Sequence, residues 1–138
     1  MKQKSGIYFT NNIAPNILGE FSLILPSIFF EVQNNNLIYS KGKAKLKASL
    51  FWSISGKLLK DLETKEQPLD GFLEISIRQN DTIIASYPIA LHDKEEIFGD
   101  EIEIFLQLKD SFSISLEVKE QKQEFLINSG FLVINEVN

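Results

Sequence analysis

The sequence predicts an all-β fold, an antiparallel β-sandwich of about eight to ten strands with at most one short helix. Apolar and polar residues alternate with a period of two along much of the chain, which is the pattern of strands with one buried face. The 138 residues include 11 Phe, and aromatic residues are enriched in strands. Because a chain of this length leaves little room for a second core, residues 1–138 are expected to form a single domain.

The longest alternating stretch covers residues 44–55 and places Leu50 and Trp52 on its buried side and Phe51 on the opposite side. Around it, four pairs of alternating segments flank short turn-forming runs and therefore predict hairpins. These pairs are 28–33 with 37–41, 73–78 with 83–89, 102–108 with 112–118, and 124–127 with 131–137.

Two segments depart from the alternation. Leu58, Leu59 and Leu62 have helical spacing between Gly56 and Pro68, which predicts a short helix within residues 57–66. At the other end, residues 5–19 are uncharged and rich in Asn, so residues 1–19 are expected to form a loosely packed N-terminal arm.

Consecutive hairpins fit either a two-sheet sandwich or an up-and-down, calycin-like barrel around a ligand cavity. Bulky Leu, Ile, Val and Phe at the inward positions favour the sandwich, because they fill a core rather than line a cavity. Gly42, Ala44 and Ala48 keep the barrel as the alternative, with a small apolar ligand as its cargo.

Charge is sorted along the chain, with eight Lys or Arg against two acids in residues 1–60 and six against seventeen in residues 61–138. Alternate lysines precede an exposed aromatic residue and make a candidate interaction surface for an acidic partner. It consists of Lys41, Lys43, Lys45, Lys47 and Phe51. Lysines on an exposed strand equally serve to prevent edge-to-edge association, and a pI near 4.9 argues against nucleic acid as the partner.

Residues 92–101 are predicted to form an acidic loop that contains the only histidine, His92. Its carboxylates are a weak candidate for a calcium site, although their spacing matches no EF-hand pattern and a solvated turn explains them as well. These residues are Asp93, Glu95, Glu96, Asp100 and Glu101. Ser86, Asp93 and Glu95 are possible partners for His92 in a hydrolytic site, but no recognised catalytic motif surrounds them.

With no cysteine, no phosphate-binding loop and no catalytic motif, the sequence predicts neither an enzyme nor a cofactor. The N-terminus lacks the pattern of a signal peptide, and the longest apolar run is too short for a membrane span, so the protein is predicted to be cytoplasmic and not membrane-bound. We expect a non-catalytic protein-interaction or assembly module, with a protein partner or self-association as a homo-oligomer. The alternatives are the barrel carrier and a calcium-dependent or hydrolytic site in residues 92–101.

Overall fold

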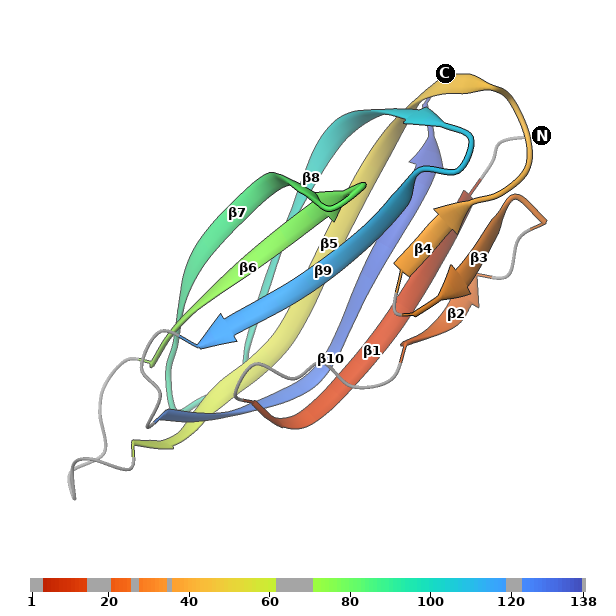
Figure 1. Cartoon of the computed structure of the whole chain (residues 1–138). Coiled ribbons are helices and arrows are strands. Elements are labelled where there is room, and N and C mark those ends of the chain that lie inside the picture. The colour runs from red at the N-terminus through yellow and green to blue at the C-terminus, as the bar shows by residue number, and fades with distance from the viewer. Residues whose placement is uncertain are drawn as a thin grey trace.

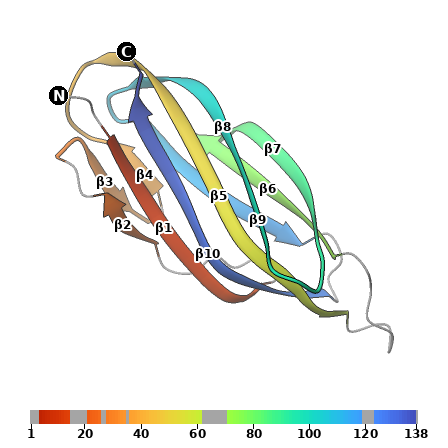
Figure 2. The same cartoon turned by 180° about the vertical axis from the view of Figure 1, so that it is seen from behind.

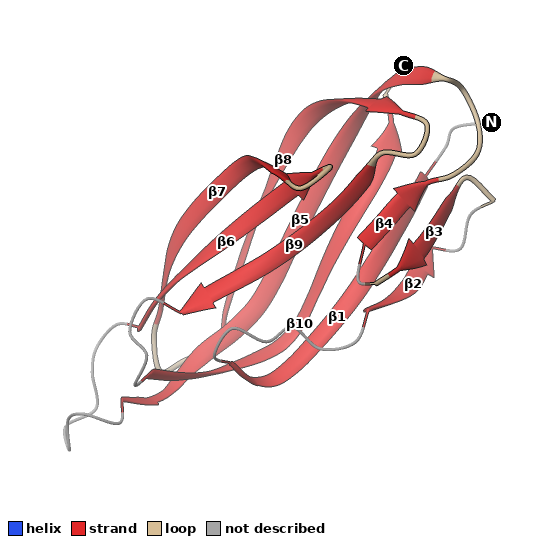
Figure 3. Ribbon diagram, in the orientation of Figure 1, coloured by secondary structure: helices blue, strands red, loops and turns tan. Residues whose placement is uncertain are grey.

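Every regular element that the structure describes is a β-strand (Figure 3). The structure is a computed structural model that describes residues 4–14, 21–25, 28–34, 36–61, 71–118 and 123–137. The strands are β1 (Lys4–Ala14), β2 (Phe21–Leu25), β3 (Phe30–Gln33), β4 (Asn36–Tyr39), β5 (Lys45–Asp61), β6 (Gly71–Gln79), β7 (Thr82–Leu91), β8 (Glu96–Gln107), β9 (Ser111–Val118) and β10 (Gln123–Glu136).

The strands form two antiparallel sheets that face each other as a sandwich (Figures 1 and 2). Sheet A has the order β2-β1-β10-β5-β8, and sheet B has the order β3-β4-β9-β6-β7. This arrangement is a jelly-roll-like sandwich, so the predicted sandwich is confirmed and the barrel alternative is not the one adopted.

The connections between strands differ from those that the sequence predicts. Only β1–β2, β3–β4 and β6–β7 are neighbours both in sequence and in a sheet, and every other step along the chain crosses from one sheet to the other. The hairpins predicted around residues 34–36 and 79–81 are therefore confirmed. The hairpin predicted around Lys109–Ser111 is wrong, because β8 lies in sheet A and β9 in sheet B.

A buried carboxylate anchors this crossing between β8 and β9. Asp110 accepts hydrogen bonds from the side chains of Gln79 and Asn80, at 2.9 and 2.8 Å, and from the backbone N–H of Gln107 at 2.8 Å. The side-chain oxygen of Asn80 in turn accepts from the backbone N–H of Ser111 at 2.9 Å. Residues that look like an ordinary turn in the sequence thus tie the β6–β7 turn to the end of β8.

The last predicted hairpin, around Asn128–Gly130, is also wrong, because β10 runs continuously from Gln123 to Glu136. Its pairing with β5 shifts register between Ile127 and Ser129, so the turn-forming residues make a bulge in one long strand.

The predicted helix is a strand as far as the structure describes it. β5 continues to Asp61, with Leu58 buried, and residues 62–66 lie outside the described residues. Pairing with β10 up to Asp61 outweighs the local helical spacing of the leucines. Of the predicted N-terminal arm, residues 4–14 form β1 between β2 and β10, and residues 1–3 and 15–19 lie outside the described part.

The core lies between the sheets and follows the alternation. In β5, Ala48, Leu50, Trp52 and Ile54 are buried, as the sequence predicts. Ile83 in β7 breaks the pattern, since a register shift after Ile77 pairs it with Arg78 and leaves it exposed. Residues from both sheets complete the core: Phe30, Leu37, Tyr39, Leu58, Leu73, Ile75, Ile77, Leu91, Ile104, Leu106, Phe112, Ile114, Leu116, Phe125, Ile127, Leu132 and Ile134.

In the described part of the chain, no helix is both long enough and apolar enough to span a membrane.

Gly71 is a point where the two sheets leave no room for a side chain. An alanine Cβ there would lie 2.6 Å from Cε1 of Phe125 and 2.8 Å from Cδ1 of Leu58. We expect Gly71→Ala to lower the free energy of unfolding by about 1–3 kcal/mol, because these buried side chains must move. Urea denaturation measures this, with Ser113→Ala on the outer face of β9 as a control expected to change by less than about 0.5 kcal/mol. An unchanged midpoint for Gly71→Ala would contradict the packing described here.

Candidate functional site

The lysines of the candidate surface do not share one strand. β5 begins at Lys45, so Lys41 and Lys43 lie in the connection that precedes it. Gly42 in this connection has a φ of 131°, a conformation that interrupts the extended chain. Only Lys45, Lys47 and Phe51 therefore lie together on the outer face of β5.

Two of these lysines already have acidic partners in other strands. Lys43 Nζ lies 2.5 Å from Oε1 of Glu136, whose side chain is only 7% exposed. Lys47 Nζ lies 3.2 Å from Oε2 of Glu103, and both of these side chains are largely solvent-exposed. Lys43 thus neutralises a buried carboxylate, whereas the Lys47 pair is a surface contact that contributes little to stability.

The acidic segment is mostly strand rather than loop. β8 begins at Glu96 because β5 is long enough to pair with it as far as Gly56. Alternation then separates the carboxylates, with Asp100 opposite Trp52 on the inward side and Glu101 opposite Phe51 on the outer face. Among the residues that the structure describes, no three Asp, Glu or His side chains gather as a metal site requires.

Two of the possible catalytic partners of His92, Ser86 and Glu95, form hydrogen bonds with other residues. Ser86 donates a hydrogen bond to Glu74 at 2.5 Å, and Glu95 accepts hydrogen bonds from Ser55, at 2.6 Å, and from Asn128. The ring of His92 contacts the carboxylate of Glu96 through Nδ1. The Glu96 carboxylate thus orients the His92 ring, while Ser86 and Glu95 are bonded to other side chains.

Sheet A exposes apolar residues on its outer face. Phe51 in β5 is 40% exposed, and Ile97 and Phe105 in β8 are 76% and 77% exposed. All three point outward, since their neighbours in sequence face the core. The half-buried Val133 of β10 lies opposite Phe51 and extends this surface across a third strand.

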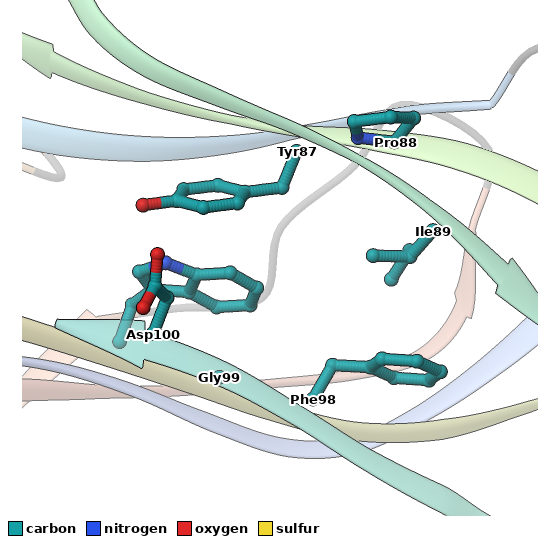
Figure 4. Close-up of a pocket in the computed structure, with 7 residues that line it drawn as sticks. Tyr87, Pro88, Ile89, Phe98, Gly99 and Asp100 are labelled. Carbon is teal, nitrogen blue, oxygen red and sulfur yellow. The ribbon is translucent and has the colours of Figure 1, made fainter.

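A pocket of about 320 Å³ lies between β7 and β8, the edge strands of the two sheets. Figure 4 shows Tyr87, Pro88 and Ile89 on the β7 side, facing Phe98, Gly99 and Asp100 on the β8 side. Trp52 of β5 also lines the pocket, and its indole lies 4.8 Å from the Tyr87 ring, centroid to centroid.

Sequence reasoning missed this pocket. It placed Trp52 in the core and Asp100 in a loop, and gave no reason to bring either to Tyr87. The residues meet only because the chain crosses between sheets, so that β7 and β8 become the edges on one side of the sandwich.

The two lysine pairs predict different effects on stability. Lys43→Ala removes an ion pair whose carboxylate, that of Glu136, is buried, and is expected to lower the free energy of unfolding by about 1–3 kcal/mol. Lys47→Ala, the matched control, removes an exposed pair and is expected to cost less than about 1 kcal/mol. Urea denaturation of both variants checks this, and equal effects would contradict the distinction between them.

Glu95 provides a test by pH titration. Hydrogen bonds from Ser55 and Asn128 to its carboxylate lower the pKa of Glu95, and nearby Lys57 acts in the same direction. Because the folded-state pKa is the lower one, this stabilisation is present above the unfolded-state pKa and is lost as the pH falls through the folded-state pKa. We expect Ser55→Ala to raise the pKa of Glu95, as measured by NMR titration of its carboxyl group. Ser49→Ala, which removes the hydroxyl bonded to Glu101, should leave the Glu95 titration unchanged.

The chain was compared with known proteins by sequence and by structure. No protein-family model and no curated protein matches the sequence. By structure, the chain is similar to murine APRIL at pH 5.0, with a TM-score of 0.57 and 9% identity over 98% of this chain and 100% of that one. The pH 8.0 structure of murine APRIL gives a TM-score of 0.53 and 10% identity over the same shares of the two chains.

Eiger TNF from S. frugiperda is similar as well, with a TM-score of 0.60 and 7% identity over 98% of this chain and 93% of that one. The predicted cytoplasmic location is contradicted by these matches, because TNF-like cytokines are secreted or extracellular. At such low identity the likeness shows the fold, and that fold is the TNF-like jelly-roll sandwich.

Proposed function

We propose that this chain is a non-catalytic protein-interaction module that assembles with copies of itself through the outer face of sheet A. The observation that carries this proposal is the exposure of Phe51, Ile97 and Phe105 on that one face. Exposed apolar side chains that extend over neighbouring strands are typical of protein-binding surfaces.

The outer face of sheet B is different in character. Ser113 and Ser115 in β9, and Ser76 and Arg78 in β6, form neighbouring pairs on this face. Sheet B also has exposed apolar residues, Phe72 in β6 at 48% and Ile83 and Ile84 in β7 at 51% and 36%. None of these is as exposed as Ile97 and Phe105 of sheet A, at 76% and 77%, which favours sheet A as the associating face.

Charge makes sheet A complementary to itself. Lys45 and Lys47 lie on the outer face of β5, and Glu101 and Glu103 lie on the same face of β8. A second copy that approaches in the opposite orientation can set its lysines against these carboxylates. Such isologous contacts, in which the same patch serves both partners, are the usual form of homo-oligomers. This favours a second copy of the chain over an unrelated partner as the occupant of the face.

The similarity to structures of APRIL and of Eiger TNF supports a role in protein binding rather than in catalysis. The dispersed carboxylates and the engaged partners of His92 support the same view.

Two matched variants test the associating face. Phe51→Lys places a charge in the middle of the proposed contact, next to Glu101, so the strand itself gains an ion-pair partner and should remain folded. We expect it to weaken self-association at least about tenfold, because a buried central contact is replaced by a charge that must be desolvated. Sedimentation velocity over a range of protein concentrations measures the change.

Phe72→Lys is the control, since it makes the same substitution at a similar exposure on the other sheet. It should self-associate as the unmodified protein does. A chain that stays monomeric at high concentration would refute the proposal, and so would equal effects of the two substitutions.

A further inference from the structure

One end of the sandwich brings together three segments that are distant in the sequence: the start of β3, the connection from β4 to β5, and the turn from β8 to β9 (Figures 1 and 2). The backbone N–H groups of Ser40 and Lys41 donate to the carbonyl of Phe29, at 2.8 and 3.2 Å. The N–H of Lys109 donates to the carbonyl of Tyr39 at 2.7 Å. These bonds join the three segments into one surface, the lysine platform, which consists of Ile28, Lys41, Lys43, Leu108 and Lys109.

Two aliphatic side chains are exposed on the lysine platform. Ile28 is 73% exposed and Leu108 is 39% exposed. Phe29 packs against the core, so the chain is anchored at the residue that follows Ile28. The N–H of Leu108 donates to the carbonyl of Ala44 at 3.2 Å, which holds this turn beside the β4–β5 connection. The platform therefore presents two aliphatic groups on an ordered backbone.

Three lysines at this end have no ion-pair partner among the residues that the structure describes. Lys41 and Lys109 lie within the platform, and Lys45 begins β5 at its margin. All three are exposed. Lys43 is paired with Glu136, but its side chain remains 63% exposed. Positive charge thus surrounds the two aliphatic side chains.

The acidic residues that adjoin these segments leave this charge largely intact. Asp110 is buried and accepts hydrogen bonds from side chains of the β6–β7 turn. Glu136 is buried and paired with Lys43. The exposed Glu31 and Asp81 lie outside the three segments, in β3 and in the β6–β7 turn.

Charge is separated between the two ends of the sandwich. Asp93 and Glu95 lie in the connection that precedes β8, whereas Leu108 follows β8, so one strand length separates them from the platform. β8 has 12 residues and spans about 40 Å, several times the screening length of about 8 Å at physiological ionic strength. An anionic surface at the platform therefore meets the local lysines rather than the net charge of −5.

The mixture of side chains distinguishes between two kinds of anionic partner. A soluble polyanion is bound by lysines alone and gains nothing from exposed aliphatic groups. The interface of a membrane has anionic headgroups above an acyl layer, so it accommodates both kinds of side chain at once. The combination of Ile28 and Leu108 with the lysines favours the membrane.

We propose that the lysine platform binds reversibly to the surface of an anionic phospholipid membrane. Ile28 and Leu108 enter the headgroup layer, and the lysines contact the anionic headgroups. Such a contact lies on the membrane and needs no spanning segment, so it is compatible with the short apolar runs of the sequence. The platform is distinct from the outer face of sheet A, and the inference does not depend on self-association there.

Co-sedimentation with lipid vesicles tests this inference. The protein should bind vesicles of phosphatidylcholine that contain about 30% phosphatidylserine, and should bind pure phosphatidylcholine at least about tenfold more weakly, because the lysines then lose their partners. Added salt should weaken binding to the anionic vesicles, since it screens these contacts. Equal binding to both kinds of vesicle, or binding to neither, would overturn the proposal.

A matched pair of charge reversals locates the contact. Lys41→Glu should weaken binding to the anionic vesicles at least about tenfold, because an attractive charge becomes a repulsive one. Lys94→Glu makes the same change in the connection at the other end of β8 and should leave binding unchanged. Both lysines are exposed, so both variants should fold, which thermal unfolding checks. Equal weakening by the two reversals would contradict binding through the platform.

A second pair tests the aliphatic contact. Ile28→Ser should weaken binding to the anionic vesicles about tenfold, because an apolar side chain no longer enters the headgroup layer. Phe72→Ser is the control, since Phe72 is also exposed but precedes Leu73, which pairs with Val118 at the far end of β9. It should bind as the unmodified protein does. If Lys41→Glu weakens binding and Ile28→Ser does not, the platform binds polyanions by charge alone and the proposed membrane contact is wrong.

Discussion

The pairing of β5 with a strand on each side is the constraint on which the rest of the structure depends. This strand has 17 residues and pairs with β8 along one edge and with β10 along the other. Because its inward positions are fixed by burial, a slip of one residue would turn Leu50 and Trp52 out to solvent. The same register turns Phe51 outward and sets Asp100 opposite Trp52, so the proposed associating face and the pocket are both consequences of it.

The edge strands of the sandwich explain why a hollow persists on one side. Among the strands that the structure describes, β7 and β8 are the last of their sheets, and each pairs along one edge alone. Pro88 interrupts the donors along β7, and the carboxylates of β8 repel a like strand, so both edges resist further pairing. These same features make the two strands poor partners for close packing. The pocket therefore lies between two strands whose residues prevent edge pairing and, for the same reason, pack poorly against each other.

Alternation in the sequence was enough to predict the fold class, the inward face of β5 and the exposure of Phe51. It was insufficient for the connections, because a period of two says which side chains share a face but not which sheet a strand joins. Lys109–Ser111 and Asn128–Gly130 have turn chemistry, yet one crosses between sheets and the other is a bulge within β10. The pocket could not be predicted either, since Trp52, Tyr87 and Asp100 meet only through those connections.

The pairing of β5 with β8 explains what the sorting of charge along the chain does in the folded protein. The basic first half contributes Lys45 and Lys47 to β5, and the acidic second half contributes Glu101 and Glu103 to β8 beside it. Each pair across exposed strands adds only a few tenths of a kcal/mol, so stability alone is a weak reason for the pattern. Charges arranged in this way act more strongly on what approaches the sheet, because they disfavour a copy in the same orientation and favour one that is reversed. The sorted charges therefore bear on the specificity of the proposed association more than on the stability of the fold.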